Sequence, residues 1–117
     1  MKKNIIKEKS FEFAFEIIKL YILLKDRKEF VISKQLLRSG TSIGANVVEA
    51  DAAQSRKDFL SKMAIASKEA RETEYWLQLL QKSTLVDIPL DDYLDEIDNI
   101  TNILTRIVKT TSESITS

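Results

Sequence analysis

The sequence predicts an all-α fold: a single domain over residues 1–117 that forms an antiparallel, up-down-up-down four-helix bundle. Two Gly and one Pro in 117 residues leave few turn signals. Apolar residues recur at steps of three and four through most of the chain, the period of a helix with one buried face. A hydrophobic content of 44% is enough for one modest core. Short connections between such helices place consecutive helices antiparallel.

The first helix is expected over about 10–25, with Ser10 as the N-cap. Its apolar residues cover more of the helix surface than the arc of ~100° that one side of a bundle buries. A deep central position would explain this surplus, and burial against another subunit, which we favour, would explain it equally. The candidate residues for an oligomer interface are Phe11, Phe15 and Ile22.

The second helix is expected over about 30–54. Gly40 and Gly44 lie one turn apart on or beside its apolar face. The absence of a side chain lets another backbone approach closely or lets the helix bend, and a ligand contact is the alternative. The residues expected to form this face are Leu36, Gly40, Ile43, Val47 and Ala50.

The third helix is expected over about 56–82, because Ser55 and Asp58 have the S-x-x-D spacing of a capping box. The fourth is expected over about 90–112, after the turn at Pro89, with carboxylates in its first turns that favour the positive end of the helix dipole. The tail beyond this helix is expected to be frayed. On each of these helices the residues expected to be buried form one row, or seam. The seam of the third helix comprises Phe59, Met63, Ala66, Ala70, Thr73, Leu77 and Leu80, and that of the fourth comprises Leu90, Tyr93, Ile97, Ile100, Leu104, Ile107 and Thr111.

The composition argues against an enzyme. Cysteine and histidine are absent, which removes thiolate chemistry, the commonest neutral-pH general base and nearly every zinc site. No nucleophile paired with a base and no phosphate-binding loop is visible. The acidic start of the fourth helix lacks the histidines of a bundle di-iron site. We expect no catalytic residue, cofactor or metal, and a cytoplasmic protein without a membrane span.

The formal charge is zero but unevenly distributed. Residues 1–40 contain ten Lys/Arg and five Asp/Glu, residues 41–83 contain six of each, and residues 84–117 contain two and seven. The differences are +5, 0 and −5, so folding either creates a basic and an acidic surface or neutralises one with the other. Candidate nucleic-acid contacts are Lys28, Lys34, Arg38, Arg56, Lys57 and Lys62. A neutral chain lacks the strong basicity of a committed nucleic-acid binder.

A polar stripe runs along the second helix at steps of three, four, four and three, opposite the apolar face. It consists of Gln35, Arg38, Ser42, Asn46 and Glu49. If it is exposed, it is a solvated face. If a neighbour covers it, its amides and charges must find partners across that contact.

The runs QLLRSGTSIGANVVEA and SRKDFLSKMAIASKEARETEYWL resemble the bacterial four-helix bundle family encoded within intervening sequences of 23S ribosomal RNA genes. The resemblance covers about residues 11–85. The chain departs from the family where Ala50, in place of the common Gly, follows Glu49, so the second helix is expected to end later than usual. The matching positions are Gln35, Leu36, Arg38, Ser42, Ile43, Asn46, Glu49, Ser55 to Phe59, Ala66, Ser67 and Glu72.

The resemblance implies a homopentameric ring with no known enzymatic activity. A similar protein accompanies diversity-generating retroelements, where it partners a reverse transcriptase and engages nucleic acid, although such members are more basic than this chain. We therefore expect a self-assembling scaffold or accessory for RNA, DNA or a nucleic-acid enzyme. The alternative is a protein–protein adaptor ring that presents its acidic fourth helix and never contacts nucleic acid.

Overall fold

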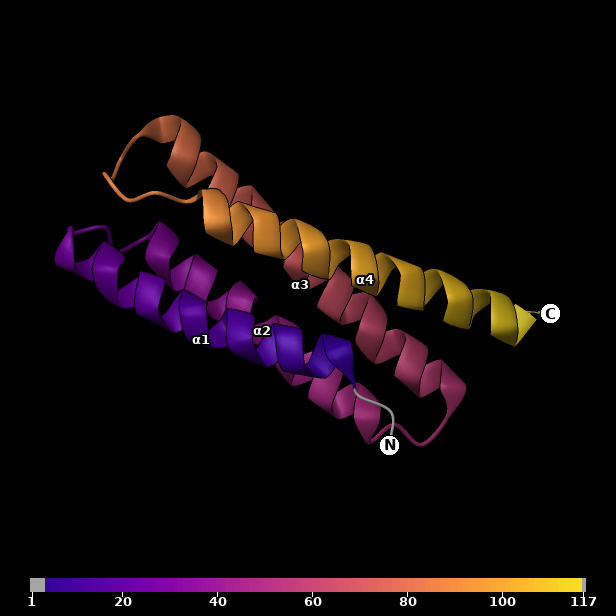
Figure 1. The fold of residues 1–117 in the computed structure, drawn as a ribbon. Helices are drawn as coiled ribbons and strands as arrows, with labels where there is room; N and C mark the ends of the chain where they lie inside the picture. The colour runs from indigo at the N-terminus through magenta and orange to yellow at the C-terminus, as the bar shows by residue number, and fades with distance from the viewer. Residues whose placement is uncertain (1–3, 117) are drawn as a thin grey trace.

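The computed structural model describes residues 4–116, which form four helices: α1 (Ile5–Asp26), α2 (Ile32–Asp51), α3 (Arg56–Ser83) and α4 (Asp91–Thr116). Consecutive helices run in opposite directions, so the α1–α2 and α3–α4 connections share one end of the bundle, and the α2–α3 connection lies at the other (Figure 1). The bundle measures 49 × 23 × 23 Å. The predicted all-α four-helix bundle is confirmed.

One core joins the four helices, and each helix contributes buried residues spaced mostly three or four apart. On α1 the buried positions are 6, 10, 13, 17, 20 and 24, the pattern of a single inward seam. The expected faces of α2, α3 and α4 are likewise buried or partly buried, so those predictions are confirmed. The largest enclosed side chains include Ile17, Leu20, Leu36, Ile43, Met63, Leu77, Ile97 and Leu104.

Helix α1 begins earlier than predicted, and Ser10 is not its N-cap. Asn4 takes that role, and its side-chain oxygen accepts a hydrogen bond from the Lys7 backbone N–H at 3.1 Å. Ser10 is buried inside the helix, where its hydroxyl donates to the Lys7 carbonyl oxygen at 3.3 Å. Both residues are good N-cap types, and the earlier one starts the helix because Ile6 adds another turn to the apolar seam.

Helix α2 is shorter than the predicted range of 30–54 at both ends. At its start, the Glu29 carboxylate accepts hydrogen bonds from the backbone N–H groups of Val31, Ile32 and Ser33 at 2.6–3.1 Å. At its end, the helix stops at Asp51 although Ala52 and Ala53 are good helix formers. The start of α3 requires an extended Ser55, so the chain must leave the helix before that residue. The predicted end at residue 54 is therefore wrong by three residues.

The predicted Ser55 cap of α3 is confirmed, although Asp58 reaches back to the residue before the cap and not to the cap itself. The Ser55 hydroxyl accepts a hydrogen bond from the Asp58 backbone N–H at 3.0 Å, and the Asp58 carboxylate accepts one from the Gln54 N–H at 3.4 Å. Ser55 has extended backbone angles, as an N-cap requires. At the other end, Thr84 closes α3 in the left-handed conformation, with φ 54°.

The predicted frayed tail is wrong, because α4 continues to Thr116. Thr111 is buried and Ile115 is partly buried, so the helix retains a protected side in its last two turns. The Arg56 guanidinium, in the first turn of α3, donates a hydrogen bond to the Ser114 hydroxyl. These contacts supply the tertiary support that a polar helix end would otherwise lack.

The two glycines let α2 approach α1 closely. A Cβ added to Gly40 would lie 2.9 Å from Cγ2 of Ile17, and one added to Gly44 would lie 3.3 Å from the carbonyl oxygen of Ser10. The close packing predicted for the glycine pair is therefore confirmed. Among the described residues, α2 and α3 share the most extensive contact, and α1 and α4 share the sparsest.

Candidate interaction surfaces

An exposed apolar surface covers the outer side of α1. Phe11, Phe15, Ile18 and Ile22 follow one another at steps of four, three and four, so they project from one side of the helix. The exposed fractions are 73% for Phe11 and 55% for Phe15. The deep central position considered for the first helix is therefore wrong for these side chains, and the surplus apolar surface stays uncovered within one chain.

A hollow adjoins this line where α1 meets α2. Its volume is about 880 Å³, and small residues form much of its wall. Phe11 and Val48 stand at its side, and Val48 is itself half exposed. The residues that line it are Lys7, Glu8, Phe11, Glu12, Ala14, Thr41, Gly44, Ala45 and Val48. We call the line Phe11–Phe15–Ile18–Ile22 together with this hollow the apolar face.

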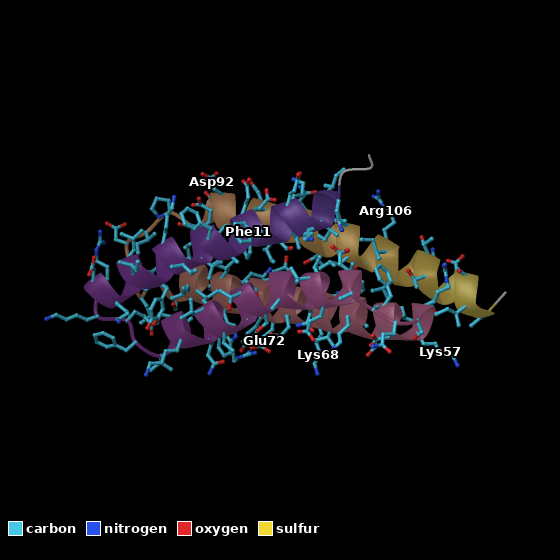
Figure 2. All side chains as sticks on the ribbon, turned by 90° about the horizontal axis from the view of Figure 1, so that it is seen from below. Phe11, Lys57, Lys68, Glu72, Asp92 and Arg106 are labelled. Atoms are coloured by element: carbon cyan, nitrogen blue, oxygen red, sulfur yellow. The ribbon has the colours of Figure 1, made fainter. Side chains whose placement is uncertain are left out.

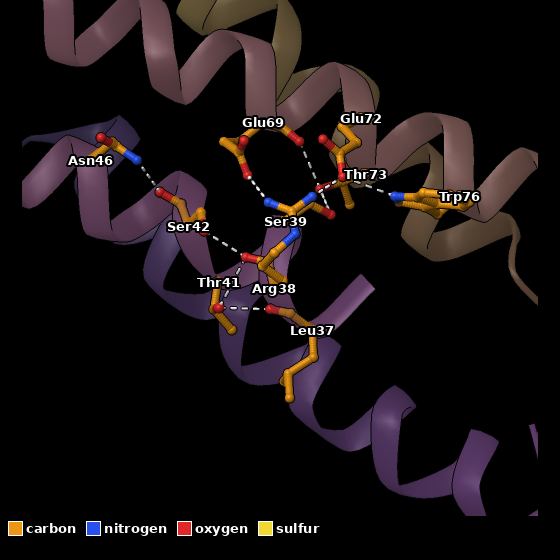
Figure 3. Close-up of polar contacts among 10 residues, drawn as sticks. All are labelled: Leu37, Arg38, Ser39, Thr41, Ser42, Asn46, Glu69, Glu72, Thr73 and Trp76. Carbon is orange, nitrogen blue, oxygen red and sulfur yellow. Dashed lines mark hydrogen bonds and ion pairs between the residues drawn. The ribbon is translucent and has the colours of Figure 1, made fainter. Parts of the chain in front are cut away.

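The polar stripe of α2, expected to lie opposite the buried face of its own helix, instead borders the contact with α3, because two of its members pair with α3 residues. Arg38 forms ion pairs with Glu69, at 3.0 Å, and with Glu72 (Figure 3). At the far end of the stripe, Glu49 pairs with Lys62 at 3.0 Å. The hydrogen bond and the charge of Glu49 raise the pKa of Lys62. The stripe thus connects two helices of one chain.

Side-chain hydrogen bonds extend the Arg38 network. The Trp76 indole N–H donates to the Glu72 carboxylate at 3.1 Å. Between the same two helices, α2 and α3, the buried Thr73 hydroxyl donates a hydrogen bond to the Ser39 hydroxyl at 2.9 Å. Ser42 and Asn46 instead donate to backbone carbonyl oxygens one turn earlier in α2 (Figure 3). Ser42 and Asn46 thereby satisfy their donors within their own helix.

The structure does not bring the six candidate nucleic-acid contacts together. Lys28 and Lys34 lie near the α1–α2 connection, whereas Arg56 and Lys57 lie at the opposite end of the bundle (Figures 1 and 2). The other two, Arg38 and Lys62, are the members already paired with carboxylates. One chain therefore offers no continuous basic patch built from these six residues.

No reaction chemistry is apparent in the described residues. Within residues 4–116, no group of three or more Asp or Glu is placed to hold a metal ion. None of the four helices over this range has the length and apolar character needed to cross a membrane. Burial, and then the charges of Glu16 and Asp92, raise the pKa of Tyr93.

Sequence reasoning missed three parts of these surfaces. Ile18 belongs to the exposed line with Phe11, Phe15 and Ile22, and the steps of four, three and four could have revealed it. Glu69 was not linked to Arg38, because partners 31 residues apart are found only when the packing of α2 on α3 is known. A hollow between two helices has no sequence signal of its own.

Comparisons with known proteins agree with this fold. A crystal structure of a Bacteroides thetaiotaomicron protein of unknown function, from the S23 ribosomal protein family, is 50% identical. The match covers 89% of this chain and 98% of that one, with a TM-score of 0.84. None of the curated proteins compared matches the chain. The family model of the 23S rRNA-intervening sequence protein matches residues 2–106, and the chain therefore belongs to the 23S rRNA-intervening sequence protein family.

Proposed function

We propose that this protein is a non-enzymatic scaffold that assembles into a closed ring, with five copies as the family resemblance implies, through the apolar face. The ring would serve as an accessory for RNA, DNA or a nucleic-acid enzyme. The observation that carries the assembly proposal is the line of four exposed apolar side chains on α1. A soluble monomer rarely keeps so continuous an apolar surface in water.

The magnitude of the exposed surface supports a stable contact. A phenylalanine buries roughly 150–250 Å², so the exposed fractions of Phe11 and Phe15 leave about 110–180 and 80–140 Å² in water. At about 25 cal/mol per Å², covering both rings would contribute about 5–8 kcal/mol before the losses of association. Ile18 and Ile22 would add to this contribution.

The layout of the apolar face favours a ring. Phe15, Ile18 and Ile22 project from α1, whereas the hollow lies beside them and is lined by small residues such as Ala14, Gly44 and Ala45. When the projecting side chains of one copy enter the hollow of the next, each copy uses two different parts of its surface. Such a heterologous contact closes into a ring when its rotation divides a full turn.

Nucleic-acid contact is the less supported half of this proposal. With Arg38 and Lys62 paired to carboxylates, the remaining candidates form one pair at each end of the bundle. Repetition around a ring axis would arrange them as two separate basic rims. The neutralisation of Arg38 and Lys62 favours the second candidate function, a protein–protein adaptor ring without nucleic-acid contact.

The test is size-exclusion chromatography with light scattering and two-wavelength absorbance on freshly purified protein. A chain of 13.4 kDa would give a pentamer of about 67 kDa. Phe15→Ala should weaken association at least tenfold, because about 2–3 kcal/mol of burial is lost. Tyr75→Ala is the matched control, since Tyr75 lies on α3 and is 56% exposed.

A monomeric wild type, or equal effects of the two substitutions, would overturn the assignment of the contact to the apolar face. Nucleic-acid absorbance that accompanies the protein and disappears in salt would favour the RNA or DNA scaffold. A pentamer free of nucleic acid, which captures the same protein partner after nuclease treatment, would favour the adaptor.

A further inference from the structure

A second groove lies between α1 and the start of α4, where the bundle is least tightly closed. Its volume is about 960 Å³, and it runs along α1 from Ile5 to Leu23. The connection before α4 closes one end, with Ile88 and Pro89 in its wall. At 1.5 Å per residue, the distance from Glu8 to Leu23 along α1 is roughly 22 Å, or about four helical turns.

Both rims of this groove are acidic. Three carboxylates come from α1 at steps of four, and three come from the first turns of α4. Lys9 is the one basic residue of the lining, and it pairs with Glu96 at 3.6 Å. Among residues 4–116, no basic side chain lies within ion-pair distance of Glu8, Glu12 or Asp92. The six rim residues are Glu8, Glu12, Glu16, Asp91, Asp92 and Glu96.

The floor of the groove is apolar and aromatic. Phe13 is buried there, Tyr93 is partly buried, and Ile5 and Leu23 remain exposed at its two ends. After burial, the largest causes of the raised pKa of Tyr93 are the charges of Glu16 and Asp92, one from each rim. The negative potential of both helices therefore acts on the floor of the same groove.

We propose that this groove binds a Lys/Arg-rich amphipathic helical segment of another protein. The carboxylates are spread along the rims, and nowhere in the described chain do three lie close enough to hold a metal ion. This spacing suits several cations borne on a helix, whose apolar side would cover Tyr93, Ile5 and Leu23. The proposal goes beyond the scaffold function and does not depend on assembly, because the groove and the apolar face share only Glu8 and Glu12, and the floor of the groove lies outside the apolar face.

The test uses a fluorescent Lys/Leu amphipathic peptide of about 18 residues, long enough to span the groove. Two peptides of the same pattern are controls: Glu/Leu reverses the charge, and Lys/Ser removes the apolar side. Binding is measured by fluorescence anisotropy with the wild type and with Glu16→Gln/Asp92→Asn, which changes one carboxylate on each rim outside the apolar-face hollow. Glu74→Gln/Glu113→Gln is the matched control, because it removes the same charge elsewhere.

We expect the Lys/Leu peptide to bind the wild type and to lose roughly tenfold in affinity with Glu16→Gln/Asp92→Asn, whereas the matched control stays within about twofold. Circular dichroism checks that each variant remains helical, and the single substitutions replace the double one if it does not. Equal losses in both double variants, equal binding of the Lys/Ser peptide, or no binding would overturn the proposal.

Light scattering on the same variants separates this proposal from the assembly proposal. If the groove receives a foreign segment, Asp92→Asn leaves the subunit number of the wild type unchanged. Glu16 pairs with Lys19, whose ammonium lies over the Phe15 ring of the apolar face, so Asp92→Asn alone decides this point. If Asp92→Asn changes the subunit number, a neighbouring copy of this chain occupies the groove, and the proposal of a foreign partner is wrong. A monomeric wild type that still binds the Lys/Leu peptide would refute only the ring.

Discussion

Substitution of Gly40 by alanine tests the close packing of α1 on α2. The added methyl would lie 2.9 and 3.0 Å from the two γ carbons of Ile17, a buried residue with no flexible end at that point. Overpacking of this kind costs about 1–3 kcal/mol. Alanine also gains about 0.8–1.0 kcal/mol over glycine in a helix interior. We expect Gly40→Ala to lower the free energy of unfolding by about 1 kcal/mol.

The assay is urea unfolding followed by circular dichroism, at one protein concentration, on a double-mutant cycle with Ile17→Ala. In the Ile17→Ala background the two γ carbons are gone, so Gly40→Ala should raise the free energy of unfolding by up to about 1 kcal/mol. Gly44→Ala is the control within the same helix, because its methyl comes no nearer than 3.3 Å to any atom, the carbonyl oxygen of Ser10. If Gly40→Ala stabilises both backgrounds equally, the argument from close packing is refuted.

Two further predictions concern polar groups. Thr73→Val should lower the free energy of unfolding by about 1–3 kcal/mol, because it leaves the buried Ser39 hydroxyl without its partner. In chemical denaturation, adding Ser39→Ala should recover part of this loss. Strictly additive losses of the two substitutions would contradict the pairing. The pKa of Tyr93 is raised in the folded state above its ordinary value of 10.0, so its contribution to stability is present below pH 10 and is lost as the pH rises through the folded-state pKa. Unfolding measured against pH should therefore show a steeper alkaline loss for the wild type than for Tyr93→Phe, and parallel curves would be evidence against the shift.

The helices and the core were predictable because their signals are local and periodic. The seam from Met63 to Leu80 and the N-cap at Ser55 each depend on residues within a turn or two of one another. The helix boundaries that were predicted wrongly, the start of α1 and the end of α2, lie where two local sequence signals compete. Asn4 and Ser10 are both good caps, and the helix formers Ala52 and Ala53 are overridden by the start of the next helix.

The surfaces were predictable only where one helix carries them. Phe11, Phe15 and Ile22 could be identified as surplus apolar residues from the sequence of α1 alone, because this helix carries more apolar residues than one buried seam can hold. Arg38 was singled out correctly as part of a stripe, but its partners Glu69 and Glu72 belong to another helix. The acidic groove likewise joins residues from the two ends of the chain, and its shape depends on how far α1 and α4 stand apart.

The sparse contact between α1 and α4 has a consequence for how the chain folds. The three extensive helix contacts join neighbours in the sequence, and α1 with α4 is the one contact that must bring distant parts of the chain together. Local contacts of this kind lower the loop-closure entropy and make folding fast. We expect the α2–α3 hairpin to form early and α4 to dock on α1 last, so that native-state hydrogen exchange should reveal α4 opening as a unit while α2 and α3 remain protected.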